Sequence, residues 1–131
     1  MKTGGESLKI IRYPLLFCAG GTAYMLLELI WRGWSHGSMF FAGGICFLLL
    51  GKISHMQVAG IFKPLLGAVG ITSVELIAGM LINRNYEVWD YRQMPLSFLG
   101  QICLPFFLLW IPLGAAAMYI YRLLDGKIKE L

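Results

Sequence analysis

Long apolar stretches separated by short polar segments make up most of this chain. Four such stretches run over about residues 13–31, 38–53, 64–82 and 96–121. A helix needs about 20 residues, within a range of about 17–25, to cross the hydrocarbon core of a bilayer. The pattern therefore predicts an all-α membrane protein, a bundle of four transmembrane helices in a single domain over residues 1–131.

The composition indicates that lipid, not water, surrounds these stretches. Hydrophobic residues make up 58% of the sequence and charged residues 14%, with a mean hydropathy of +0.70, whereas soluble domains are about 25% charged. The three cysteines, Cys18, Cys46 and Cys103, lie in apolar stretches and predict buried reduced thiols. The sequence has no Gly-rich phosphate loop and no zinc-type Cys/His spacing. We therefore expect no cofactor, no metal site and no ATPase activity in this chain.

Positive charge is distributed unevenly between the two sides of the predicted membrane. Eight of the 11 Lys and Arg residues lie at the termini and between the second and third spans, and the other connections carry Arg32, Arg84 and Arg92. Because cytoplasmic segments are enriched in Lys and Arg, we expect a multi-pass protein of the cell (cytoplasmic) membrane with both termini cytoplasmic. The net charge of +4 is then assigned to orientation and lipid headgroups, not to nucleic acid.

The basic N-terminus followed by an apolar run resembles a signal peptide. The run continues to Trp31 without a clear small-residue cleavage site. We therefore expect an uncleaved first span.

Two glutamates lie within the apolar stretches, where a carboxylate costs about 2.5–3.5 kcal/mol by insertion scales. Arg32 follows Glu28 by four residues, a spacing at which an acid and a base pair on one helix face. Glu75 lies deeper in its span and has no basic residue one turn away. Its carboxyl group is therefore expected to be protonated or to find a partner across the bundle, such as Arg32, Arg84, Arg92 or Gln101. A ligand-binding role and a structural role are both consistent with these positions.

The predicted outer loop over residues 83–95 is dense in polar and aromatic side chains. It holds two carboxylates, two guanidinium groups and three large aromatic rings within thirteen residues. Folded inward, the loop would complete a pocket with the glutamates, and the further candidate ligand-binding residues are Trp34, His36, Trp89, Asp90, Tyr91 and Gln101. Aromatic rings beside acids suit an organic cation, whereas arginines beside aromatic rings suit an anion. The alternative for the Trp and Tyr residues is an interfacial aromatic belt.

The two halves of the chain resemble each other over short segments. Leu27-Glu28-Leu29-Ile30 recurs as Val74-Glu75-Leu76-Ile77, and each is followed by a Trp-bearing loop. This similarity predicts two pseudo-repeated helical hairpins, with chance as the alternative. Frequent glycines and alanines predict close helix packing. Pro105 and Pro112 are expected to bend the fourth helix, either freeing carbonyls toward a ligand or only shaping the bundle.

Several of these residues also occur in a pattern typical of a known family of multi-pass membrane proteins of largely unknown function. Glu75, Gly79, Trp89-Asp90-Tyr91, Pro95-Leu96, Gly100 and Trp110 resemble the C-terminal pattern of the ABC-transporter permease family of the CmpB type, and Gly21, Glu28, Arg32-Gly33, His36-Gly37 and Gly43 resemble its N-terminal half. The likeness covers about residues 20–120 and implies transport. It departs at Arg92 and Ser97, where the family favours serine and asparagine. The resemblance implies that Glu28, Arg32, Glu75, Trp89 and Asp90 are site residues.

Three functions are compatible with these features. The favoured one is a transporter or permease that binds a small polar or charged ligand in an outward-facing cavity lined by acidic and aromatic residues. Four helices are too few to enclose a pathway across the membrane. We therefore expect the protein to act as a homodimer, with membrane lipid and a small-molecule or ion ligand as partners. The second is a non-transporting membrane scaffold or regulatory subunit. The third is an intramembrane enzyme acting on lipid with Asp90 or Glu75 as general base, and the lack of an obvious nucleophile ranks enzymatic activity last.

Overall fold

Long apolar helices account for nearly all of the ordered structure. The computed structural model describes residues 2–130, and their side chains between residues 11 and 130. Within these limits the elements are α1 (Lys2–Arg32), α2 (Gly37–Ser54), α3 (Phe62–Ile82), β1 (Ser97–Phe98), β2 (Ile102–Cys103) and α4 (Leu104–Glu130). Each of the four helices contains a segment long and apolar enough to cross a membrane. The prediction of an all-α membrane protein is confirmed.

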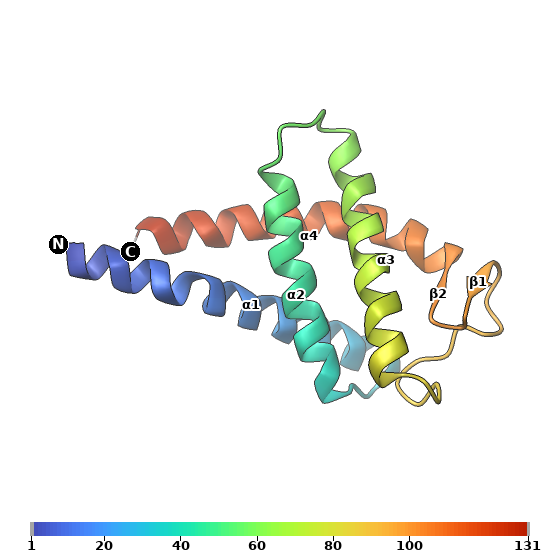
Figure 1. Ribbon diagram of the computed structural model, residues 1–131. Coiled ribbons are helices and arrows are strands. Elements are labelled where there is room, and N and C mark those ends of the chain that lie inside the picture. The colour runs from blue at the N-terminus through green and yellow to red at the C-terminus, as the bar shows by residue number, and fades with distance from the viewer. Residues whose placement is uncertain (1, 131) are drawn as a thin grey trace.

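Helix α2 is the central element of the bundle. It contacts each of the other helices, and half of its apolar stretch is buried, compared with 17% in α1 and α4. Figure 1 shows α1 and α4 running side by side toward the neighbouring termini, with the α2–α3 hairpin crossing them steeply. We call the end with the termini and residues 55–61 the termini end, and the end with residues 33–36 and 83–103 the loop end.

Aromatic rings pack directly onto glycines where α1 meets α2. A Cβ atom added at Gly20 would overlap the side chain of Phe47, and one at Gly44 would overlap Phe17. The contacts therefore run in both directions between the helices. In lipid, helices associate by close packing and not by the hydrophobic effect, and small residues allow that approach. The predicted role of the glycines in helix packing is confirmed at this interface.

A cluster of ionisable side chains joins α1, α4 and the end of α2 at the termini end. Arg12 on α1 forms a two-point ion pair with Asp125 on α4, including a 2.8 Å bond from Nη2 to Oδ2. Lys129 Nζ lies 3.5 Å from the same carboxylate and His55 Nε2, at the end of α2, lies 4.0 Å from it. Asp125 is 2% exposed, so these partners supply the contacts that water would otherwise make.

The fourth helix begins later than the sequence pattern predicts. Residues 96–103 were predicted to be helical, but Ser97 and Phe98 pair with Cys103 and Ile102 in an antiparallel hairpin. Leu96, Leu99 and Gly100 have φ angles of 50°, 54° and 69°, which a right-handed helix cannot continue through. The residues of this tight turn are as apolar as a membrane span, so the sequence pattern predicted a helix where the chain forms a hairpin.

Pro105 consequently has a different role from the predicted one. It lies in the first turn of α4, where the missing N–H would have had no helical partner. Only Pro112 lies inside the helix. The expectation that both prolines bend the helix is therefore wrong for Pro105.

The contact between α2 and α4 at Gly51 provides a test of the packing. A Cβ atom at Gly51 would overlap the ring of Tyr121, which is 3% exposed and has no room to retreat. We expect Gly51→Ala to lower the free energy of unfolding in detergent by about 1–3 kcal/mol, because the core becomes overpacked. Gly126→Ala is the matched control, since nothing lies within 4 Å of the added atom. That variant should be neutral or stabilising by about 0.5–1 kcal/mol in a thermal unfolding assay.

Candidate functional site

Glu75 lies in the interior of α3 and is held by two neutral donors. Trp110 Nε1 on α4 donates to Oε1 at 2.8 Å, and the Tyr91 hydroxyl donates to Oε2 at 3.1 Å. The residue is only 9% exposed. Within residues 11–130 no Lys, Arg or His forms an ion pair with it. The carboxyl group is thus hydrogen-bonded but not neutralised by the protein.

Aromatic rings from three parts of the chain surround this carboxyl group. Tyr91 stacks on Phe106 with a centroid distance of 4.9 Å, and Phe106 lies 6.2 Å from Trp110. Tyr24 on α1 closes the group, with its ring 6.3 Å from that of Trp110. We call these five residues, Glu75, Tyr24, Tyr91, Phe106 and Trp110, the Glu75 cluster. The polar edges of Tyr91 and Trp110 thus meet the acid at the loop end of the bundle, and the other two rings pack against them.

A second acid lies beside the cluster and is paired. Arg32 Nε lies 2.6 Å from Glu28 Oε2 on the same helix face, which confirms the predicted pair. Arg32 also donates to the backbone oxygen of Val88 at 2.6 Å and stacks over Trp34 at 3.9 Å from the ring centroid. Glu28 follows Tyr24 of the cluster by one helical turn, on the same face of α1. The arginine therefore links the end of α1 to the loop, with Glu28 as its ion-pair partner.

Asn83 organises the loop directly beneath the cluster. It is 1% exposed, and its Oδ1 accepts from the amides of Val88 and Trp89 at 2.8 and 3.1 Å. Its Nδ2 donates to the Trp89 carbonyl at 2.6 Å and to Gln101 Oε1 at 2.8 Å. Gln101 Nε2 returns a bond to the Asn83 carbonyl, and Trp89 Nε1 donates to the Gln101 carbonyl. This closed set of bonds holds residues 84–101 against the end of α3.

Asp90 lies outside this arrangement. It forms a two-point ion pair with Arg92, with bonds of 2.9 and 2.7 Å, and Arg92 stacks over Tyr86. Hydrogen bonds from Arg92 lower the pKa of Asp90 from 3.8 to about 2. A carboxylate with so low a pKa is a poor general base near neutral pH. Asp90 is therefore ill suited to the general-base role that an enzymatic function would give it.

The structure brings together part of the predicted site. Glu75 and Tyr91 are in direct contact, Trp89 and Gln101 lie in the adjoining network, and Glu28 and Arg32 border it. His36 caps α2 at an exposed position, where Nδ1 accepts from the Ser38 amide. Trp34 is exposed and contacts Arg32.

The predicted partners of Glu75 were wrong. Arg32 pairs with Glu28, Arg84 donates to the carbonyl of Met80 on the preceding helix α3, and Arg92 pairs with Asp90. Gln101 bonds to Asn83. Each of the four predicted partners thus bonds to another group. The hydrogen bonds to Glu75 come instead from two neutral donors, Tyr91 and Trp110.

Sequence reasoning missed the site roles of Tyr24, Asn83, Phe106 and Trp110. Tyr24 precedes Glu28 by one helical turn and so lies on the same face of α1. Asn83 lies two helical turns beyond Glu75. Both spacings can be read from the sequence and could have identified Tyr24 and Asn83 as neighbours of the two glutamates. The position of Trp110 opposite Glu75 depends on where α4 begins, which the apolar pattern misplaced.

The hydrogen bonds of Asn83 predict its effect on loop stability. In Asn83→Ala the buried amides of Val88 and Trp89 lose their acceptor, which costs about 1–3 kcal/mol for each unsatisfied group. We expect a lower unfolding temperature and faster trypsin cleavage after Arg84 and Arg92. Asn85→Ala is the control, because Asn85 is exposed. Equal cleavage rates in both variants would contradict the role assigned to Asn83.

Comparison with known proteins identifies a family but no characterised relative. A family model described as "Putative ABC-transporter type IV" matches residues 15–130. No curated protein and no solved structure matches the chain significantly. The matched range includes every residue of the Glu75 cluster and of the Asn83 network. The chain therefore belongs to the "Putative ABC-transporter type IV" family.

Proposed function

We propose that this protein is a small membrane component of a transporter in which the Glu75 cluster binds a proton or a small cation. The observation that carries the proposal is a buried carboxyl group inside a membrane helix that accepts from two neutral donors and has no basic partner within residues 11–130. Ionisable residues within membrane spans are costly and typically mark ion or substrate pathways. The family description, which refers to ABC transporters, agrees with this role.

The chemistry of the cluster favours a positively charged ligand. The two hydrogen bonds from Tyr91 and Trp110 stabilise the carboxylate but supply no formal charge. Aromatic faces attract organic cations by about 0.5–2 kcal/mol. A proton or an organic ammonium group therefore fits this site better than an anion.

A pathway would need more protein than one copy supplies. Helices α1 and α4 are mostly exposed, with 17% of their apolar stretches buried. These faces suit lipid or a second copy of the chain, and we propose a homodimer that meets through them. The sequence carries no phosphate loop, so ATP hydrolysis, if it drives this system, belongs to another polypeptide segment.

A non-transporting scaffold or regulatory subunit is the second candidate. It is favoured by the hydrogen bonding itself, because both oxygens of Glu75 have donors and Glu28 has Arg32. In that case the acids would hold α1, α3, α4 and the loop together without binding a ligand. The two candidates differ in whether Glu75 exchanges a partner during function.

Replacing Glu75 separates the candidates. Glu75→Gln keeps the size of the side chain and removes its charge, so we expect cation binding to weaken about tenfold or more, the equivalent of about 1.4 kcal/mol. Binding is measured on purified protein by titrating quaternary ammonium ions and following tryptophan fluorescence, with Trp110→Phe identifying the signal of the residue that donates to Glu75. Flux is measured in liposomes with a pH-sensitive dye and a panel of organic cations.

Asp90→Asn is the matched control for the loss of one carboxylate. The low pKa of Asp90 means that it stays charged above about pH 4, and any stabilisation from its pair with Arg92 is lost only as the pH falls toward about 2. Its replacement should leave the pH profile of binding between about pH 5 and 8 unchanged. Wild-type binding and flux in Glu75→Gln would contradict the transporter proposal. A drop in unfolding temperature alone would favour the scaffold.

We also propose that both termini are cytoplasmic in the cell membrane, as the Lys and Arg distribution favours. Cysteine labelling tests this orientation in a Cys18→Ser background, because Cys18 is exposed while Cys46 and Cys103 are buried. An impermeant maleimide added to intact cells should label Glu87→Cys in the loop and leave Gln57→Cys unlabelled until the cells are opened. The reverse pattern would place the termini outside.

A further inference from the structure

A second polar site lies at the termini end, and its lining shares no residue with the Glu75 cluster. A pocket of about 200 Å³ opens between the end of α2, the start of α3 and the C-terminal half of α4. Its lining includes Ser54, Lys63, Ala115, Met118 and Arg122. Since one water molecule takes up about 30 Å³ of liquid, the space fits a phosphate group with a few attached carbons.

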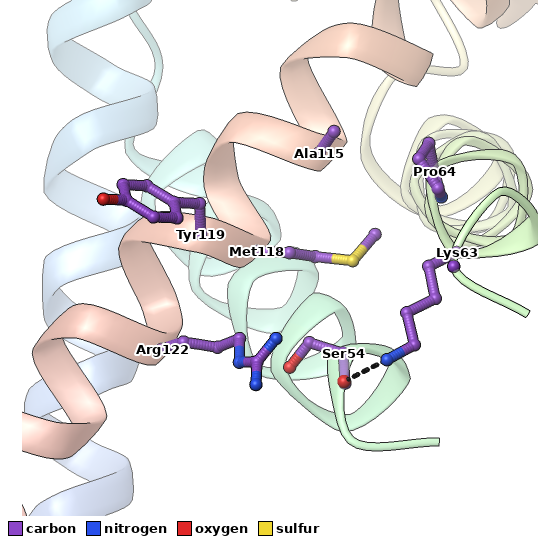
Figure 2. Close-up of a pocket in the computed structure, with 8 residues that line it drawn as sticks. Ser54, Lys63, Pro64, Ala115, Met118, Tyr119 and Arg122 are labelled. Carbon is purple, nitrogen blue, oxygen red and sulfur yellow. Dashed lines mark hydrogen bonds between the residues drawn. The ribbon is translucent and has the colours of Figure 1, made fainter. Parts of the chain in front are cut away.

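Two cations approach the pocket from different helices. Figure 2 shows Lys63 on α3 and Arg122 on α4 both directed toward Ser54 at the end of α2. Lys63 Nζ donates to the Ser54 carbonyl at 2.8 Å, which fixes the ammonium group while leaving two of its three N–H donors free. Ser54 is 4% exposed and its hydroxyl donates to the Gly51 carbonyl. The lysine is thus positioned, and not merely a solvated surface charge.

No carboxylate neutralises these cations in the part of the chain that the structure describes. None of the lining residues is acidic. Asp125 follows Arg122 by three residues, but its ion pairs are with Arg12 and Lys129, and His55 Nε2 lies 4.0 Å from it. Across residues 11–130, Lys63 and Arg122 form no ion pair. The pocket therefore carries uncompensated positive charge.

The surroundings of the pocket match the membrane boundary. Large apolar residues next in sequence to the lining residues are highly exposed, namely Ile61 at 81%, Phe62 at 55%, Ile120 at 49% and Leu123 at 52%. Ala115 and Met118 provide an apolar wall inside it. Cations beside an apolar surface suit a phosphate whose attached chains lie along the helices. Basic pockets between membrane helices are known to hold anionic lipid headgroups.

We propose that this pocket binds a phosphate group through Lys63 and Arg122, carried by an anionic membrane lipid or present as the free ion. The guanidinium group of Arg122 can donate two parallel hydrogen bonds to phosphate oxygens, and Lys63 adds a point charge. The first turn of α3 lies beside the pocket, and its helix dipole favours an anion. The inference is independent of any role of Glu75.

Lipid binding to the full-length chain tests the proposal. The protein in a neutral detergent is titrated with phosphatidylglycerol or with phosphatidylcholine, and bound lipid is counted by native mass spectrometry. We expect phosphatidylglycerol to bind the wild type preferentially and Lys63→Gln/Arg122→Gln to weaken that binding about 25-fold, from about fivefold for each basic residue. Lys52→Gln/Lys127→Gln is the matched control, because both lysines are exposed and neither lines the pocket. It should change binding by less than about twofold, well under one basic contact.

A parallel arm with sodium phosphate at constant ionic strength identifies the source of the phosphate. Displacement of phosphatidylglycerol by inorganic phosphate, with an equal thermal stabilisation, assigns the site to the free ion. Retention of the lipid assigns it to the membrane. Equal binding of phosphatidylcholine, or equal binding by the double variant and wild type, would overturn the proposal.

A variant that leaves both cations in place keeps the proposal testable if the double variant does not fold. Ala115→Phe fills the pocket while both cations remain. It should also lose phosphatidylglycerol, and full retention of the lipid by this variant would overturn the proposal.

Discussion

The hydrogen bonds between Asn83 and Gln101 are the interaction on which the loop end of this protein depends. They close a buried ring of donors and acceptors that fixes where the chain turns back after α3. Because lipid and protein around these groups offer no alternative partners, each bond that is lost leaves a buried group unsatisfied. The position of Tyr91, and hence one donor to Glu75, follows from this ring. A structural amide pair thus determines the environment of a carboxylate two helical turns away.

Each end of the bundle buries a carboxyl group, and the two ends supply its partners in different ways. At the termini end the buried Asp125 is surrounded by basic groups, with Arg12 in direct contact. At the loop end Glu75 accepts hydrogen bonds from two neutral donors. Truncating one partner of a buried ion pair typically costs several kcal/mol, which suits a permanent connection between α1 and α4. The donors to Glu75 carry no formal charge, so the loss of one of them removes a hydrogen bond and not an ion pair.

The apolar pattern predicted the spans well, and local spacing predicted the pair of Glu28 and Arg32, because both depend on residues within one helix. It could not predict the partners of Glu75, which lie 16 and 35 residues away along the chain. Their positions depend on how α4 packs on α3. The error at residues 96–103 has a related cause. Leu96 and Leu99 are apolar but adopt left-handed backbone conformations, which hydropathy does not encode.

The two donors to Glu75 belong to different parts of the fold, Trp110 to a helix and Tyr91 to the connecting loop. Each oxygen of the carboxyl group is therefore covered by an element that is attached to the rest of the bundle in its own way. The two elements also touch each other, because the Tyr91 ring stacks on Phe106 of α4. A shift of α4 that moved Trp110 would therefore disturb Tyr91 as well, so the environment of this acid responds to the junction of loop and helix as one unit.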